Sequence, residues 1–135
     1  MEMVEKISFR TSREVEIIDI TGKVADIVKR SGVGSGIALV FTKHTTTAVI
    51  INENEPGLLG DLEELLSRLV PRGAGYRHDR IDDNAHSHLR GILLGPSVAV
   101  PVEEGRLLLG TWQRILFVEL DGPRNREVYV KVCRC

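Results

Sequence analysis

The sequence predicts an α+β fold: a single domain in which a curved or sandwiched antiparallel sheet is accompanied by two or three helices. Three observations predict it. Short β-branched segments occur at both ends of the chain, segments with helical spacing lie between them, and turn residues separate neighbouring strands. With 135 residues, 42% of them hydrophobic, the chain is long enough for one core and too short for two. Residues 1–135 are therefore expected to form one domain.

The expected strands are segments with alternating or β-branched character. The first two are expected to pair with each other, because only a short polar segment with Thr11 and Ser12 separates them. The glycines at 32, 34 and 36 follow a helical segment and precede a strand, which is the reverse of a dinucleotide-binding loop, so they predict a plain connection. The strands are expected over residues 4–9, 14–20, 37–41, 46–51, 97–102, 106–109, 113–120 and 127–132.

Three segments have the apolar spacing of helices: 21–30, 56–70 and 84–94. Thr21 and Asn84 are expected to cap the first and the third. Residues 72–83 form a long polar loop, and long loops within compact domains are often functional. The residues expected to face the core are Leu58, Leu62, Leu65, Leu66 and Leu69 of the second helix and Leu89, Ile92 and Leu93 of the third.

Composition excludes several classes of function. The net charge is -1, with 18 basic and 19 acidic residues intermixed, and aromatic residues make up 4%, so no nucleic-acid partner is expected. No apolar run is long enough to cross a bilayer and the N-terminus lacks signal-peptide order, which predicts a soluble cytoplasmic protein without a membrane partner. Cys133 and Cys135 are too close in sequence to bridge each other and are expected to be reduced thiols.

All four histidines lie in the middle of the chain, and three of them are interleaved with Asp and Asn in 76–89. Imidazole is the commonest protein ligand for zinc. On a helix, His86 and His88 point in different directions, so one of them is expected to join His44 and His78 in a metal site with an open position. The alternative is that these are surface or hydrogen-bonding histidines, since no short metal motif is present.

Two other groups are candidate site residues. Asn52, Glu53 and Asp61 follow a strand, where a glutamate can act as a base or bind a hard cation such as Mg²⁺; the alternative is helix capping. Trp112 follows Gly110 in a β region and suits a small flat ligand, although a lone tryptophan is otherwise a core residue.

Arg124 and Arg126 follow an Asp-Gly-Pro turn. They can bind phosphate, but arginines at a turn are usually exposed to solvent.

Five short motifs occur in this order along the chain: 44–48 (HTTTA), 52–54 (NEN), 76–79 (YRHD), 82–88 (DDNAHSH) and 105–113 with its ending GTWQ. Taken together, they resemble the YjbQ family, also called secondary thiamine-phosphate synthases. The resemblance covers nearly the whole chain. It implies a compact α+β domain with a jelly-roll-like sheet, a homotrimeric assembly and a histidine-lined site that often carries zinc.

The resemblance also implies an activity: a transferase that joins hydroxymethylpyrimidine diphosphate to thiazole phosphate and releases pyrophosphate, as a secondary activity beside a different main substrate. Zinc is the expected cofactor, with magnesium as an alternative for a diphosphate substrate. The implied metal ligands are His44, His78 and His88, with His86 at a more variable position; the implied catalytic residues are Asn52, Glu53, Asp83 and Gln113, and the implied substrate-binding residues are Asp61, Gly110, Thr111 and Trp112.

Two alternative functions remain open on the sequence. The same site suits a metal-dependent hydrolase of a phosphorylated small molecule, which would release phosphate without a second substrate. It also suits a non-enzymatic, trimeric metabolite-binding module, for which closed metal coordination would be the sign.

Overall fold

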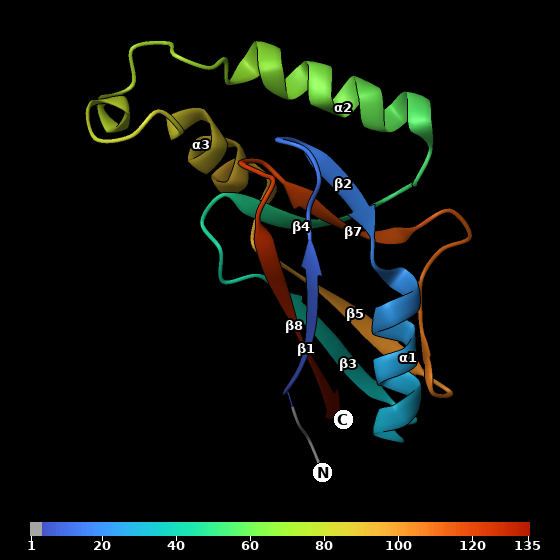
Figure 1. The fold of residues 1–135 in the computed structure, drawn as a ribbon. Helices are drawn as coiled ribbons and strands as arrows, with labels where there is room; N and C mark the ends of the chain where they lie inside the picture. Colours follow the sequence, from blue (N-terminus) through green and yellow to red (C-terminus); the bar gives the residue numbers. More distant parts are fainter. Residues whose placement is uncertain (1–3) are drawn as a thin grey trace.

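The computed structural model describes residues 4–135 and has eight strands, three α-helices and a 3-10 helix (Figure 1). The helices are α1 (Thr21–Ser31), α2 (Pro56–Leu69) and α3 (Ala85–Leu94), and the 3-10 helix is η1 (Arg77–Arg80). The strands are β1 (Val4–Arg10), β2 (Glu16–Asp19), β3 (Gly36–Phe41), β4 (Thr47–Asn52), β5 (Ser97–Glu103), β6 (Arg106–Leu107), β7 (Arg114–Glu119) and β8 (Asn125–Arg134).

The strands form two antiparallel sheets that face each other across one core. The larger sheet has the order β1-β8-β3-β5-β6 and the smaller one β2-β7-β4. The main apolar cluster joins Val40 and Val130 of the larger sheet to Val49 and Phe117 of the smaller one, and α1 adds Val24 to it. The expected α+β class with a sandwiched antiparallel sheet is therefore confirmed.

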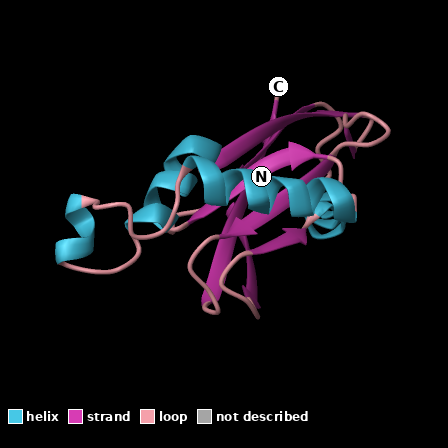
Figure 2. Cartoon of the chain, turned by 90° about the horizontal axis from the view of Figure 1, so that it is seen from above, coloured by secondary structure: helices cyan, strands magenta, loops and turns pink. Residues whose placement is uncertain are grey.

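The outer face of the three-stranded sheet carries α2 and α3. A second, smaller apolar cluster joins Ala48, Val118 and Leu120 to Leu66 of α2. In Figure 1 both helices lie at one end of the domain, whereas α1 lies beside the sheets. Figure 2 shows the segment between α2 and α3 projecting from one side of the domain. No helix within residues 4–135 has the length and apolar character that crossing a bilayer requires.

The expected hairpin of the first two strands is wrong. β1 pairs with β8, and β2 pairs with β7 in the other sheet. The chain changes sheets at Thr11, whose backbone N–H donates to the Arg124 carbonyl oxygen at 2.9 Å. A two-stranded ribbon buries little apolar surface by itself, so each segment is more stable beside a longer C-terminal strand.

The inward faces expected for the second and third helices are also largely wrong. Of the five leucines of α2 that were expected to face the core only Leu66 is buried, and Leu69 is 64% exposed. On α3, Ile92 is 74% exposed, whereas the small residue Gly91 packs inward. A Cβ on Gly91 would lie 3.2 Å from the Thr47 carbonyl oxygen, so α3 approaches β4 closely through its small residues. The buried face of α3 is therefore the one whose small residues let its backbone approach β4, not the one with the largest apolar side chains.

The expected side-chain caps of the first and third helices are absent as well. Thr21 Oγ1 accepts the Ile115 N–H at 2.7 Å and so ties α1 to β7. At the start of α3, Asp79 Oδ1 accepts the Ala85 N–H at 3.0 Å. The Asn84 side chain is thereby left for other partners.

Candidate functional site

His44, His78 and His88 lie along one groove, which we call the histidine groove. His78 and His88 line a hollow of about 560 Å³ together with Arg77, and their ring centroids are 4.7 Å apart. His88 also lines an adjoining hollow of about 400 Å³ together with His44 and Lys43. His88 is therefore the residue that the two parts of the groove share.

Three different elements supply these histidines. His44 lies in the turn between β3 and β4, His78 on η1, and His88 on α3. Because Gly91 lets α3 approach the Thr45 and Thr47 carbonyl oxygens, the helix places His88 beside the turn that carries His44. The groove thus depends on the packing of α3 against β4.

His44 is held as a neutral ring with a defined tautomer. The Glu127 backbone N–H donates to His44 Nε2 at 3.0 Å, so the ring proton is on Nδ1. Burial, and next the positive charge of Arg126, lower the pKa of His44 from its ordinary value of 6.5. In this arrangement His44 offers an N–H donor, and its predicted role as a metal ligand requires the bond to Glu127 to break.

His78 and His88 differ from His44 in this respect. His78 Nε2 lies 3.1 Å from Asn84 Oδ1, a carbonyl acceptor, which places the ring proton on Nε2 and leaves a lone pair on Nδ1. Among the hydrogen bonds of residues 4–135, none involves the ring of His88. These two adjacent rings therefore have nitrogen lone pairs that can bind an outside group.

The donor set fits a metal ion in part. Imidazole nitrogen suits zinc, and a metal-binding histidine usually donates its other N–H to a carbonyl or carboxylate, as His78 does to Asn84. In the described part of the chain, however, no three His, Cys, Asp or Glu side chains are close enough together to hold an ion. One chain offers two imidazoles, and further ligands must come from elsewhere.

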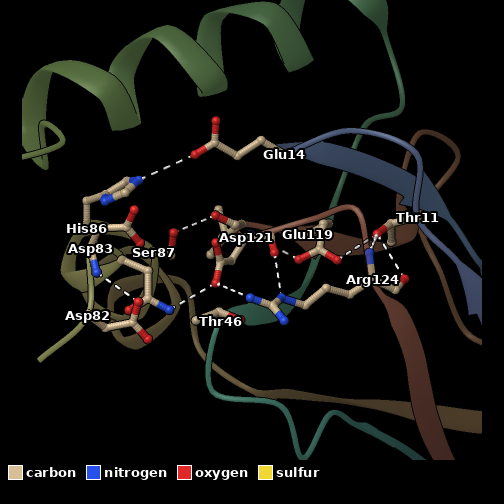
Figure 3. A network of polar contacts seen from close by, with 12 residues as sticks. Thr11, Glu14, Thr46, Asp82, Asp83, His86, Ser87, Glu119, Asp121 and Arg124 are labelled. Atoms are coloured by element: carbon tan, nitrogen blue, oxygen red, sulfur yellow. Dashed lines mark hydrogen bonds and ion pairs between the residues drawn. The ribbon is translucent and has the colours of Figure 1, made fainter.

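His86 lies apart from the groove, in the interior of the domain. It is 2% exposed, and its Nε2 lies 3.6 Å from Glu14 Oε1 (Figure 3). Its Nδ1 is buried and has no hydrogen-bond partner among residues 4–135. His86 and His88 thus lie on different faces of α3, as the helical spacing predicts.

A buried polar network lies next to the groove, and the sequence reasoning missed it. The Arg126 guanidinium donates to both oxygens of Glu119, at 2.8 and 2.6 Å, between the two sheets. Figure 3 shows Glu119 beside Thr11, whose hydroxyl donates to it at 2.8 Å, and Asp121, whose N–H donates at 3.0 Å. Burial raises the pKa of Glu119, but these hydrogen bonds lower it by more.

The exposed position expected for Arg126 is therefore wrong, since the side chain is 5% exposed. The signal was present in the sequence. Arg126 is in phase with Val128, Val130 and Val132, which alternate inward along β8, so a period of two already places it on the core face. Arg124 does lie at the turn, where it forms an ion pair with Asp121 at 3.1 Å.

Asn52 and Glu53 lie at the other end of the smaller sheet. Asn52 pairs with Arg114 at one end of the β4–β7 ladder, and Thr47 pairs with Glu119 at the end near the groove. The two ends are five residue steps apart along the strand, on the order of 17 Å. A single chain therefore does not bring Asn52 and Glu53 to the histidines.

The Gly110–Gln113 turn belongs to the same distant end. Gly110 N–H donates to Gln113 Oε1 at 2.9 Å, which closes the turn, and Thr111 is exposed within it. Trp112 is 71% exposed, so the alternative that it is a core residue is wrong.

Two predicted acidic residues lie elsewhere on the surface. Asp61 is exposed on α2. Asp83 is exposed in the loop before α3, 3.7 Å from Arg72. Neither lines the histidine groove, and their predicted roles stay predictions.

Comparison with known proteins gives consistent matches over the whole chain. A family model described as "UPF0047 protein YjbQ-like" matches residues 5–135. A UPF0047 protein of Archaeoglobus fulgidus is 56% identical over 126 residues, which cover 93% of this chain and 98% of that protein. The UPF0047 protein YugU of Bacillus subtilis is 37% identical over 134 residues, 96% of this chain and 98% of that one.

Solved structures agree. A crystal structure of a YbjQ-like protein of unknown function from Sulfolobus solfataricus has a TM-score of 0.97 at 40% identity and covers 100% of this chain and 99% of that one. A hypothetical protein from Aeropyrum pernix has a TM-score of 0.95 at 41% identity, with 98% and 99% covered.

These comparisons overturn the expected thiamine-phosphate synthase activity. The relatives are named only as UPF0047 proteins, and the Sulfolobus protein is described as one of unknown function. The three-histidine metal centre on which that transferase relied is also not assembled by the described residues. The resemblance is confirmed for the family and the fold, and the activity inferred from it is withdrawn.

Proposed function

We propose that this chain, which belongs to the UPF0047 family of YjbQ-like proteins, binds a divalent cation through His78 and His88 and a small phosphorylated molecule in the histidine groove. The observation that carries the proposal is the pair of adjacent imidazoles at 4.7 Å, one of them oriented by Asn84.

Zinc is the cation that this donor set favours. Imidazole nitrogens bind zinc well, whereas magnesium prefers carboxylate and water oxygens. Of the side chains that line this part of the groove, none is a carboxylate. A zinc ion held by two histidines keeps coordination positions for the bound molecule or for a neighbouring subunit, and it would supply positive charge to an anionic ligand.

The charges along the groove support an anionic ligand. Arg77 lines the hollow with His78 and His88, and Lys43 lines the adjoining hollow. His44 adds a neutral ring whose proton is on Nδ1. Arginine, lysine and N–H donors are the groups that bind phosphate in proteins.

We further propose that the protein assembles as a homotrimer. The outward face of β3 carries Ile37, Leu39 and Phe41, all more than a third exposed, next to Pro101 of β5. Contiguous apolar surface of this kind is typical of interfaces between subunits. An adjacent subunit would also be a source of the ligands that a single chain lacks.

Zinc titration of the metal-free protein tests the cation site. We expect His78→Ala and His88→Ala each to weaken zinc binding by about 100-fold, because each removes one of two ligands. His44→Ala is the matched control: its Nε2 is already occupied, so zinc affinity should change by less than about threefold.

The outcomes separate the alternatives. Retention of zinc affinity in both His78→Ala and His88→Ala would reject the site. A loss in His44→Ala as large as in the other two would show that His44 is a ligand and that its bond to Glu127 breaks. Circular dichroism of each variant confirms that the fold is intact.

A further inference from the structure

Asn84 connects the histidine groove to the polar network behind it. Its Nδ2 lies 2.9 Å from Asp121 Oδ2, and its Oδ1 lies 3.1 Å from His78 Nε2. The Asn84 side chain is 8% exposed, so water has little access to replace either partner. Asp121 in turn accepts from Arg124 Nη2 at 3.1 Å and, as Figure 3 shows, lies next to Glu119.

Only one set of donors and acceptors satisfies this chain of contacts. A carboxylate accepts hydrogen bonds and does not donate them, so the NH₂ group of Asn84 must face Asp121. The carbonyl oxygen of Asn84 then faces His78, and it accepts only if His78 carries its proton on Nε2. The orientation of the Asn84 amide is therefore decided by Asp121, not by the histidine.

We infer that Asp121 is a positioning residue: acting through Asn84, it holds His78 in the Nε2–H tautomer and so keeps the Nδ1 lone pair available to a ligand. The inference rests on the proposed function for the identity of that ligand. The tautomer itself is a property of the metal-free chain.

The assignment explains why neighbouring histidines differ in role. His44 receives a backbone N–H on Nε2 from Glu127 and carries its proton on Nδ1, whereas His78 donates from Nε2. The fold thus gives the two rings opposite tautomers. One is suited to donate to a bound molecule and the other to bind a cation.

The experiment is nuclear magnetic resonance of the metal-free, full-length protein labelled with ¹³C and ¹⁵N in histidine, at about pH 8, where an ordinary imidazole is neutral. Ring nitrogen and Cδ2 shifts report the tautomer, and His78→Gln identifies the His78 signals. We expect a single Nε2–H tautomer for His78 in the unaltered chain. In Asp121→Ala the amide of Asn84 is free to turn, so His78 should exchange between its two tautomers and its ring shifts should move away from those of the pure Nε2–H form.

Two further variants make the test specific. Asp82→Ala is the matched control, because its carboxylate accepts the Asp83 N–H and does not contact Asn84, and it should leave the His78 shifts unchanged. The exchanged pair Asn84→Asp with Asp121→Asn restores an acceptor facing His78 and a donor facing position 84, and it should recover the Nε2–H signals. Zinc affinity should fall about tenfold or more in Asp121→Ala and return in the exchanged pair.

An Nδ1–H tautomer of His78 in the unaltered chain, or unchanged His78 shifts in folded Asp121→Ala, would overturn the inference. The proposed function fails separately. If zinc does not bind while the His78 tautomer responds to Asp121→Ala as expected, the positioning role of Asp121 is supported and the proposed cation site is rejected. If zinc binds but the His78 tautomer does not change in Asp121→Ala, the cation site is supported and the positioning role of Asp121 is rejected.

Discussion

Gly36 of β3 lies against Cys133 of β8 so closely that a Cβ on Gly36 would overlap the Cys133 carbonyl oxygen. Gly36 pairs with Arg134, the residue next to Cys133, and both strands are interior in the larger sheet. The glycine therefore fixes how near the C-terminal strand can approach β3.

Gly36→Ala is expected to destabilise the protein by about 1–3 kcal/mol, because the strands must separate to admit the methyl group. Urea unfolding measures the change. Gly34→Ala is the control: a Cβ there meets nothing within 4 Å, and a change below about 0.5 kcal/mol is expected. Equal effects of the two substitutions would show that the contact with Cys133 is unimportant.

Glu119→Gln is expected to destabilise the protein by about 3–5 kcal/mol, because it leaves the buried Arg126 guanidinium without a counter-charge. The unfolding free energy from urea titration measures it. Glu127→Gln is the matched control, because Glu127 lies next to Arg126 on β8 but its ion pair with Lys6 is partly exposed to solvent. This substitution should change the unfolding free energy much less. If the two substitutions proved equivalent, Glu119 would have no special role in stability.

Acid should remove the contribution of Glu119 to stability. Its pKa in the folded chain is lowered from the ordinary value of 4.5, so above 4.5 the group is ionised in both states and its full contribution is present. As the pH falls below 4.5, the unfolded chain takes up the proton first and stability is lost. The difference in unfolding free energy between the unaltered chain and Glu119→Gln should therefore shrink as the pH falls below 4.5 toward the lower pKa of the folded chain. A difference that is independent of pH would contradict this assignment.

Leu39→Lys is expected to convert the proposed trimer to monomers, because it places a charge in the centre of the apolar face of β3. Analytical ultracentrifugation gives the mass directly. Gly22→Lys introduces the same side chain at an exposed position of α1, and it should leave the assembly unchanged. A Leu39→Lys protein of unaltered mass would mean that the face of β3 is not the interface.

The sequence by itself determined the class of fold, the approximate bounds of most strands and helices, and the region that holds the histidines. These follow from local patterns, since alternation along β3 and β8 and the 3.6-residue spacing in α1 are properties of single segments. Even the burial of Arg126 follows from local sequence, because it lies two residues before Val128 and alternate residues of a strand share a face. The family followed from the motifs, and their order along the chain is itself local information.

Only the tertiary structure decided which strands pair, which faces of α2 and α3 are buried, and which histidines meet. β1 and β2 are neighbours in sequence but belong to different sheets, because each gains more by pairing with a C-terminal strand. Gly91 made the approach of α3 to β4 possible and brought His88 between His44 and His78. One hydrogen bond sets the tautomer of each ring. His44 accepts from the N–H of Glu127, which is distant in sequence, and His78 donates to Asn84, whose amide is oriented by the distant carboxylate of Asp121. Contacts of this kind depend on three-dimensional distance, which periodicity and composition do not encode.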